Sequence, residues 1–526
     1  MRIDSDRMVN LSLIAITVCG TLFRLIPPLT TVGLPFYDPH GYYHDILVMQ
    51  KTHSDPLLSP FGYTGEVPLL DYMLYLVMSY SGLDALSTTK WVQPLLLSVV
   101  NIPAIYWLTA RISKRRDIGL IGALLFAISD VGALRESYAI PEGIATAILL
   151  CMVIALFKFV ESRSPSWLLV FSVLLLGVFT AHNLTPFMFF LILLGVTPVL
   201  SKVGRESSSY LLMLPLSIAG VFTAFTPLGA SIDQNAYVRY AQLISLAFSN
   251  AQAITSGSGF GSPLAGYQTG GGQSLISFME LHLITVFTLM LALFALLKYL
   301  AKPSRDPFQA IVFAWLIITG VTFVMGVLGD SLFGANNPFF GYRTWIYLMF
   351  PASIVAAYTV RSLFTRGKKL MVLGTLCLIF VLSVSAPLTV HFIQSDSENF
   401  ELLDAHELAV SNWLVSHVTL PYTVYSAGAF TPTINGSLFE APKKESMALL
   451  LGNATVWPQN LTHYYVILSQ RTLDYPFASS SYRVNTNKFY SPFFDVVYSS
   501  QTVWVFSNVN LSSIQYNFTI NSLQGD

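Results

Sequence analysis

Apolar runs of about 20 residues recur along most of this 526-residue chain. That is the length an α-helix needs to cross a bilayer, and backbone polar groups in lipid must be satisfied within the segment, so we expect each run to be a helix. Hydrophobic residues make up 53% of the chain and charged residues 11%, against about 25% charged residues in soluble domains. Eleven runs are present, near 8–27, 89–110, 117–134, 141–159, 166–182, 186–201, 209–228, 281–300, 307–328, 343–362 and 369–391.

The Lys and Arg residues gather at alternate connections between these runs. With a cytoplasmic N-terminus, the inner segments hold 17 of the 28 Lys and Arg residues, as the positive-inside rule predicts. An extra span at 69–83 would break the alternation, so we predict a re-entrant or surface helix there. The first run lacks a small-residue cleavage site and is predicted to remain as a span. The scheme places outer loops at 28–88, 133–141, 229–279 and 329–342.

The chain beyond the last apolar run has a different character. It carries five Asn-x-Ser/Thr sequons, which are accepted only on the outer or lumenal face, although chance in an Asn- and Ser-rich segment is the alternative. Runs of β-branched and aromatic residues, such as 496–498 and 503–506, follow an expected helix at 398–416. We therefore predict a transmembrane domain at 1–394 and an extracytoplasmic α/β domain at 395–526. The sequons begin at Asn435, Asn453, Asn460, Asn510 and Asn517.

Several classes of function are disfavoured by what the sequence lacks. The three cysteines, Cys19, Cys151 and Cys377, all lie in apolar runs, so we expect no disulfide in the C-terminal domain. Phosphate-binding glycine loops and basic nucleic-acid patches are not evident, and nucleic acid is not an expected partner. We see no internal repeat, which weighs against a secondary transporter.

Ionisable residues in the predicted outer loops are functional candidates by default. Asp38 and His44 lie in the first outer loop, where the alternatives are a solvated carboxylate and a packing histidine. Glu142 follows Pro141, where a carboxylate also serves as a helix cap.

Three further candidates come from the later outer segments. Arg135 precedes the fourth run, and an ion pair with Glu136 is its simpler interpretation. His182 lies in a tight outer turn. Arg343 stands at the mouth of a late run, where a snorkelling anchor is the alternative.

Taken in order, these residues resemble the motifs of GT-C glycosyltransferases, and most of all those of the archaeal-type oligosaccharyltransferase catalytic subunit. That subunit has a first-loop motif Asp-x-x-x-Tyr-x-His, which 38–44 matches. A second acidic motif opens a later span, and 135–143 stands in its place. A late span begins Arg-x-x-Ile-Tyr-x-x-x-Pro, as 343–351 does here.

Three features depart from the oligosaccharyltransferase pattern. The second motif is Asp-x-Asp or Asp-x-Glu in that family, whereas this chain has Ile140-Pro141-Glu142, with one carboxylate fewer. The loop at 229–279 contains no Glu, which the family uses as a further ligand. The Trp-Trp-Asp-Tyr-Gly acceptor motif is absent near 424–430. These departures favour another lipid-linked-sugar transferase over a protein N-glycosylation enzyme.

The resemblance implies a polyprenyl-phosphate or polyprenyl-diphosphate sugar donor and an acceptor on the outer face. Asp38 and Glu142 would be the catalytic carboxylates, with Asp38 as the base that takes the acceptor proton. The same two residues would hold Mg²⁺ or Mn²⁺ if a metal is used, although such cations prefer more oxygen ligands than two. Substrate contacts would come from the cations and histidines of the outer loops, His44, Arg135, His182 and Arg343.

Two alternatives stay open beside this glycosyltransferase. One is a divergent oligosaccharyltransferase that moves a whole glycan onto protein, and the other is an inactive relative or a transporter. Expected partners are the dolichyl- or polyprenyl-linked donor, a protein, glycan or lipid acceptor, and the bilayer. The predicted topology, the sequons and the absent disulfides fit an archaeal plasma membrane.

Overall fold

The computed structural model describes residues 5–30, 34, 38–53, 68–162, 164–182, 184–203, 282–303, 306–333, 341–365, 409–410, 423–425, 464–469, 495–499 and 503–507. The chain divides into two compact units, Met1–Ser397 and Glu398–Asp526. The predicted spans at 209–228 and 369–391, the loop at 229–279 and the predicted domain boundary at 394–395 lie outside the described residues.

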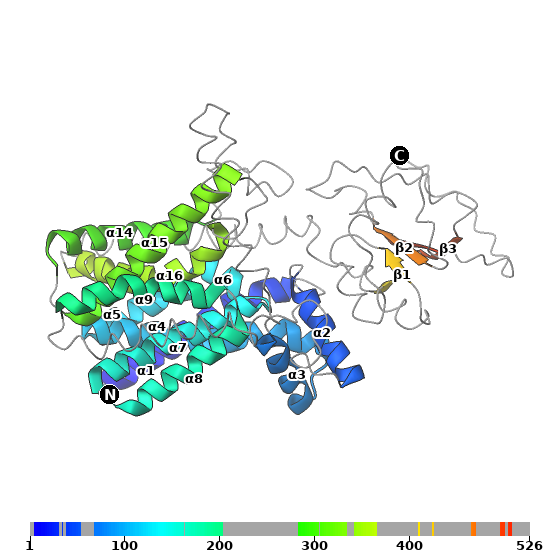
Figure 1. Ribbon diagram of the computed structural model, residues 1–526, viewed down its shortest axis with the longest axis horizontal. Helices are drawn as coiled ribbons and strands as arrows, with labels where there is room; N and C mark the ends of the chain where they lie inside the picture. The colour runs from blue at the N-terminus through cyan, green and yellow to red at the C-terminus, as the bar shows by residue number, and fades with distance from the viewer. Residues whose placement is uncertain are drawn as a thin grey trace. The chain divides into compact units, whose positions relative to one another are not determined.

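Every element described in the first unit is an α-helix (Figure 1). Among the described residues, six helices are long and apolar enough to cross a membrane, or seven if one bent pair counts as a single span. The elements are α1 (Ser5–Thr30), α2 (Asp38–Thr52), α3 (Leu69–Ser81), α4 (Ala85–Ser113), α5 (Arg116–Ala127), α6 (Asp130–Glu136), α7 (Pro141–Ser162), α8 (Pro165–Ala181), α9 (Leu184–Val203), α14 (Leu283–Ala301), α15 (Pro307–Phe333) and α16 (Gly341–Thr365).

The run predicted as a span at 117–134 is a broken helix. Helices α5 and α6 meet at an angle of 64°. The polar pair Ser129-Asp130 begins a new helix, because the Ser129 hydroxyl accepts a hydrogen bond from Gly132 N and the Asp130 carboxylate accepts one from Val131 N. A polar cap in the middle of an apolar run thus replaces a continuous helix with two short ones.

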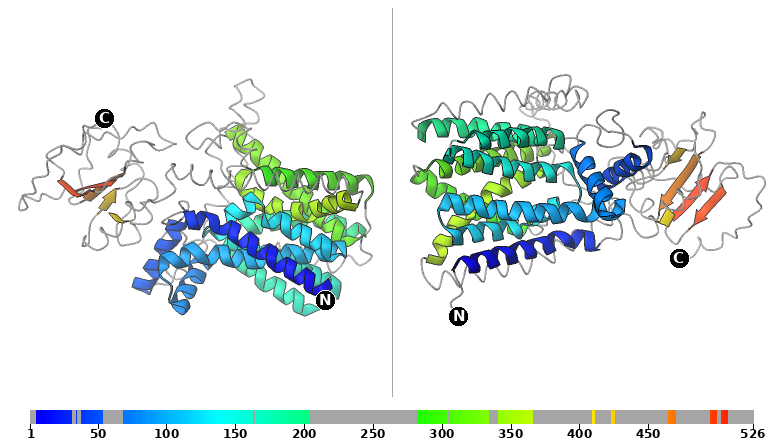
Figure 2. Two further views of the ribbon diagram at one scale, coloured as in Figure 1. Left: turned by 180° about the vertical axis from the view of Figure 1, so that it is seen from behind. Right: turned by 90° about the horizontal axis from the view of Figure 1, so that it is seen from below.

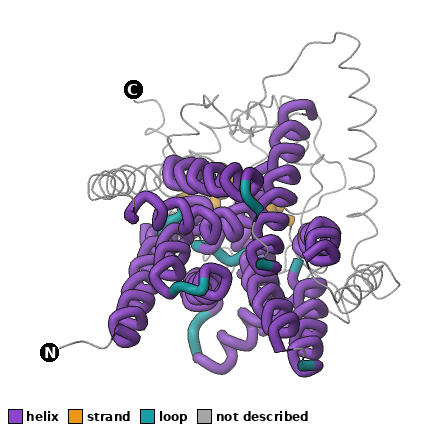
Figure 3. The backbone as a smooth tube through the Cα atoms, turned by 90° about the vertical axis from the view of Figure 1, so that its left-hand side faces the viewer, coloured by secondary structure: helices purple, strands orange, loops and turns teal. Residues whose placement is uncertain are grey.

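Helices α4, α5, α7 and α16 supply much of the main apolar core. Helix α4 packs on α5, α7 packs on α8, and α16 packs on α14, α15 and α5. Large buried side chains of this core include Phe126, Phe157, Trp315, Tyr347 and Phe350. In the tube view of Figure 3, short loops join consecutive helices wherever the connection is described.

Helices α2 and α3 lie at one end of the helix bundle in both Figure 1 and Figure 2. Helix α3 covers the run at 69–83 that was predicted to be a surface or re-entrant helix. It buries Leu70, Leu74 and Met78 while Tyr80 is exposed, so only one face of α3 packs on the protein. With 13 residues, α3 is too short to cross a bilayer alone.

Segments predicted to share the inner side of the membrane meet at one end of the bundle. Arg116 pairs with Asp6 at 2.5 Å, which joins the start of α5 to the start of α1. Lys114 pairs with Asp306 at 3.2 Å, and Arg361 at the end of α16 pairs with Asp117 at 3.1 Å. The contacts agree with helices of alternating direction; which side of a membrane they face stays a prediction.

The second unit contains a four-stranded sheet in the order β1-β2-β4-β3. Strand β1 (Thr423–Tyr425) runs parallel to β2 (Tyr464–Ser469), and β4 (Val503–Ser507) is antiparallel to both β2 and β3 (Asp495–Ser499). The two predicted β-branched and aromatic runs form β3 and β4, with an irregularity between Val496 and Tyr498. The predicted helix at 398–416 is described only at 409–410, so the α/β class stays a prediction.

Candidate active site

The connection from α6 to α7 brings two of the predicted site residues together. Arg135 in the last turn of α6 and Glu142 in the first turn of α7 approach to 3.7 Å between Nη1 and Oε2. Their side chains are only 12% and 6% exposed, so the pair is shielded from water far more than an ordinary surface ion pair. Arg135 Nη1 also donates a hydrogen bond to the Tyr138 hydroxyl at 3.1 Å. The arrangement replaces the Arg135–Glu136 pair that the sequence offered as an alternative.

Gln93 on α4 holds this connection in place. Its Nε2 donates to the Tyr138 carbonyl at 2.6 Å, and its Oε1 accepts from Ile140 N at 3.0 Å. These contacts supply partners for backbone groups of the buried non-helical stretch between α6 and α7. A Cβ on Gly143 would lie 2.3 Å from Gln93 Nε2, so a glycine is needed for α7 to approach the amide this closely.

The first-loop motif packs against the same connection. Helix α2 begins at Asp38, and its Tyr42 and Ile46 lie in one buried cluster with Tyr138 and Ile140. Asp38 lies one helical turn before Tyr42, so its backbone belongs to the turn that adjoins this cluster. The side chains of Asp38 and His44 are outside the described residues. The structure therefore brings the two predicted motifs together at the level of the backbone.

A tyrosine of the first-loop motif is electrostatically perturbed. Burial of Tyr43 and the nearby charge of Asp84 raise the pKa of the phenol. Asp84 caps the N-terminus of α4, where its carboxylate accepts hydrogen bonds from Ser87 N and Oγ at 2.8 and 2.7 Å. Those bonds lower the pKa of Asp84. At neutral pH the Tyr43 phenol is therefore neutral, and the nearby Asp84 carboxylate is charged.

His182 belongs to a second polar chain. Its Nδ1 lies 2.9 Å from the Thr185 hydroxyl, which in turn lies 2.6 Å from the Tyr347 hydroxyl. Thr185 and Tyr347 are fully buried. Tyr347 is one turn beyond Arg343 on α16, so the chain ties the turn between α8 and α9 to the helix that carries Arg343. The Arg343 side chain itself is outside the described residues.

A carboxylate that sequence reasoning missed lies at the break between α5 and α6. Asp130 is 2% exposed, its Oδ2 lies 3.1 Å from His282 Nδ1, and the Thr285 hydroxyl donates to Oδ1. The His282 ring also contacts Trp345, with centroids 5.2 Å apart. The polar Ser129-Asp130 step marked this position in the sequence. The partners of Asp130, His282 before α14 and Thr285 in its first turn, are more than 150 residues away.

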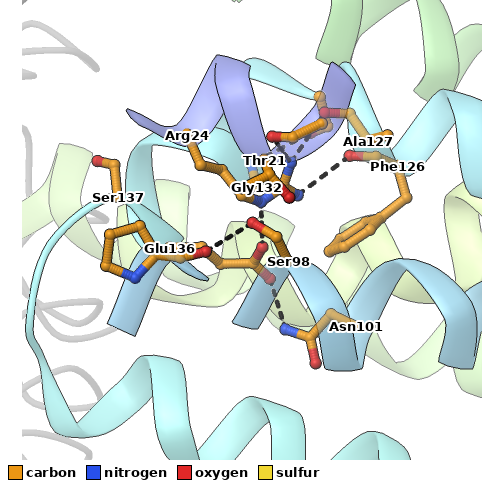
Figure 4. A network of polar contacts seen from close by, with 12 residues as sticks. Thr21, Arg24, Ser98, Asn101, Phe126, Ala127, Gly132, Glu136 and Ser137 are labelled. Carbon is orange, nitrogen blue, oxygen red and sulfur yellow. Dashed lines mark hydrogen bonds and ion pairs between the residues drawn. The ribbon is translucent and has the colours of Figure 1, made fainter. Parts of the chain in front are cut away.

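A second missed pair is fully buried. Arg24 on α1 and Glu136 at the end of α6 are 0% exposed, with Nε and Oε2 at 2.5 Å (Figure 4). Asn101 Nδ2 donates to the other carboxylate oxygen at 2.6 Å. The pair is separated by 112 residues, and no local pattern could have matched them.

The described residues offer little to a divalent cation. They contain no group of three or more His, Cys, Asp or Glu side chains placed to hold a metal ion. Of the two residues predicted as metal ligands, Glu142 already faces the Arg135 guanidinium, and a second cation on that carboxylate would be repelled. The roles of Asp38 and Glu142 as metal ligands stay a prediction, because the Asp38 side chain is outside the described residues.

The fold is similar to those of solved structures that include an archaeal oligosaccharyltransferase. Neither a protein-family model nor a curated protein sequence matches the chain. The archaeal oligosaccharyltransferase AglB from Archaeoglobus fulgidus, in complex with an inhibitory peptide and a dolichol-phosphate, matches with TM-score 0.58 and 12% identity over 88% of this chain and 70% of that one. ArnT from Cupriavidus metallidurans bound to undecaprenyl phosphate matches with TM-score 0.58 and 11% identity over 98% and 100%. Apo ArnT gives 0.53 and 12% over 94% and 98%.

These likenesses extend along most of the chain and confirm that it resembles AglB and ArnT in fold. At identities of 11 to 12% they establish the fold, and function has to be argued from the site.

Proposed function

We propose that this protein is a membrane glycosyltransferase that moves a sugar from a polyprenyl-phosphate or polyprenyl-diphosphate donor to an acceptor on the outer face of the membrane. The similar folds of AglB and ArnT, which were solved with dolichol-phosphate and undecaprenyl phosphate, support this class of donor. The observation that carries the proposal is the shielded Arg135–Glu142 pair, next to the cluster that receives the first turns of α2.

The proposed reaction is an inverting displacement at the anomeric carbon. The acceptor oxygen attacks that carbon while its proton passes to the Asp38 carboxylate, and the bond from the carbon to the phosphate oxygen breaks. The phosphate leaves with the electron pair and gains negative charge. A positioned carboxylate is a suitable base for such a step.

The developing charge on the phosphate needs a fixed cation near it. Arg135 suits this role, since a guanidinium binds phosphate through two parallel N–H groups. We assign Arg343 the same role from its place at the mouth of α16. His44 and His182 would donate hydrogen bonds to the phosphate or the sugar, and Glu142 would orient the acceptor while holding Arg135 in position.

The predicted topology completes the proposal. The N-terminus would be cytoplasmic, and the α6–α7 connection, α2 and the second unit would lie on the outer side. An archaeal plasma membrane would suit this arrangement. Mg²⁺ or Mn²⁺ remains part of the proposal only as a variable for experiment, because Glu142 is already paired with Arg135.

The second candidate is a divergent oligosaccharyltransferase, which the likeness to AglB favours. It would transfer a whole glycan to a protein acceptor. An inactive relative or a transporter is the non-enzymatic alternative.

The test is a transfer assay on the purified full-length chain. Radiolabelled polyprenyl-phosphate and polyprenyl-diphosphate sugars are supplied with peptide or lipid acceptors, in Mg²⁺, in Mn²⁺ and in EDTA. Asp38→Asn is compared with Asp84→Asn, which removes a carboxylate at the start of α4 but keeps a good capping side chain. Glu142→Gln is compared with Glu161→Gln, a half-exposed residue at the far end of α7.

We expect turnover that Asp38→Asn and Glu142→Gln abolish or greatly reduce and that the two controls retain. Transfer to peptide instead of lipid would select the oligosaccharyltransferase. Donor binding without turnover in the wild type would select an inactive relative, and full activity in Asp38→Asn would remove Asp38 as the base.

A further inference from the structure

The Arg24 guanidinium occupies the bend between α5 and α6 (Figure 4). Its Nη1 donates to the carbonyl of Ala127 at 2.9 Å and to that of Gly20 at 3.0 Å, and its Nη2 reaches the carbonyl of Phe126 at 3.5 Å. Its Nε donates to Glu136 at 2.5 Å. One side chain from α1 therefore contacts the end of α5 and the end of α6 at once.

The bend needs such a side chain for a physical reason. The last carbonyls of a helix have no partner within that helix, and inside a membrane water is not at hand to replace one. Phe126 and Ala127 are the last two residues of α5. The Phe126 carbonyl also accepts from Ser129 N at 3.2 Å, so the Ala127 carbonyl is the one that depends most on Arg24. A guanidinium has five N–H donors in a rigid plane, so it can serve these carbonyls on one side and a carboxylate on the other.

Fixing Glu136 also fixes its neighbour Arg135. Glu136 accepts from Arg24 and from Asn101, so its position is set by α1 and α4. Arg135, the preceding residue of α6, contacts Glu142 and the Tyr138 hydroxyl. Any change in the bend that moves the Glu136 end of α6 must move Arg135 relative to Glu142.

A gain in folding stability does not by itself explain why Arg24 and Glu136 form a buried ion pair. Replacing a buried ion pair by apolar residues of similar size is often neutral or stabilising, whereas removing one partner is strongly destabilising. What an apolar pair lacks is a group that hydrogen-bonds to both arms of the bend.

We propose that Arg24 is a positioning residue for the Arg135–Glu142 pair. By joining the terminal carbonyls of α5 to Glu136, it sets the bend between α5 and α6 and with it the place of Arg135 beside Glu142. The effect on turnover rests on the proposed function, whereas the effect on the bend does not.

Three variants test this inference by different routes. Arg24→Lys keeps the charge but replaces the rigid planar set of guanidinium donors with a single ammonium on a flexible chain. Gly20→Ala leaves every charge in place, yet its Cβ would lie 2.9 Å from Ala127 Cβ and 2.5 Å from Ile102 Cδ1, so α1 must shift away from the bend. The double variant Arg24→Met with Glu136→Met removes both charges together and the bridge with them.

Two controls match these changes elsewhere in the first unit. Arg116→Lys alters an exposed ion pair that also joins α5 to α1, at their other ends. Gly320→Ala adds a methyl group in α15 where nothing lies within 4 Å.

The readouts are amide hydrogen exchange, apparent melting temperature and steady-state turnover. We expect faster exchange confined to 128–140 in all three variants, and a fall in kcat of about 10-fold to 100-fold with a smaller change in KM. The double variant should recover the melting temperature that Arg24→Lys loses, while its kcat stays low. The controls should match the wild type in all three measurements.

Two results would overturn the inference. One is unchanged exchange at 128–140 in Arg24→Lys and Gly20→Ala. The other is a double variant that recovers exchange protection and kcat along with the melting temperature, which would make the pair purely structural. If the wild type turns over no donor, the proposed function fails, and the exchange pattern alone decides whether Arg24 sets the bend.

Discussion

Among the side chains that hold the connection between α6 and α7, Gln93 on α4 should be the one whose loss destabilises the protein most. We predict that Gln93→Leu destabilises the first unit, because it removes the hydrogen bonds to the Tyr138 carbonyl and to Ile140 N. Leu is similar in volume, so the change tests the amide groups more than the packing.

The magnitude follows from the two contacts. Each lost hydrogen bond to a buried backbone group costs on the order of 1–3 kcal/mol. Additional apolar burial by Leu offsets about 1 kcal/mol of the sum. The expected loss in the free energy of unfolding is therefore about 1–5 kcal/mol, enough to lower the melting temperature by several degrees.

The assay is thermal unfolding of the purified protein followed by tryptophan fluorescence. Gln50→Leu, the same substitution at an exposed position of α2, is the control and should melt with the wild type. If Gln93→Leu also melts with the wild type, the amide does not hold the connection, and the reasoning on Gln93 is wrong.

Two further predictions concern a helix cap and a close helix contact. Asp84→Ala should destabilise the protein by about 1 kcal/mol at neutral pH, through loss of the α4 N-cap. Because folding lowers the pKa of Asp84, its carboxylate stabilises the folded wild type fully above the unfolded pKa of about 3.9. This stabilisation is lost as the pH falls through the lower folded pKa. Chemical denaturation of both proteins across acidic pH should therefore show the difference in their free energies of unfolding becoming smaller as the pH falls. Gly122→Ala should destabilise by about 1–3 kcal/mol, since its Cβ would lie 2.5 Å from Thr109 Oγ1 and push α5 off α4. Gly320→Ala, which has open space around it, should melt with the wild type in the same assay.

Most described spans could be predicted because a membrane-spanning helix is marked by residues that are consecutive in the sequence. A helix that crosses lipid needs its apolar residues in one unbroken run, and the run at 141–159 accordingly lies within α7. The break in the run at 117–134 escaped prediction because only two polar residues mark it. The Ser129-Asp130 step has the chemistry of a helix cap, so the signal was present but was outweighed by the length of the run.

The candidate site was predictable only in part. Arg135 and Glu142 are seven positions apart, and the short polar stretch around them identified both as candidates. Their pairing depended on the turn between α6 and α7, which Gln93 holds from another helix. Contacts such as Asp130 with His282 join residues more than 150 positions apart, and a single sequence holds no local pattern from which to pair them.

The Arg24–Glu136 contact also has a consequence for how the protein is made. A chain is synthesised from its N-terminus, so Arg24 enters the membrane 112 residues before Glu136 exists. An unpartnered arginine costs about 2.5–3.5 kcal/mol at the centre of a span and less toward the end, where Arg24 lies in α1. We therefore expect α1 to insert less efficiently by itself than in a chain that also contains α5 and α6. In a truncated chain ending before α5, Arg24→Leu should raise the inserted fraction of α1, whereas in the full chain the same change should leave a buried carboxylate unpaired and lower the yield of folded protein.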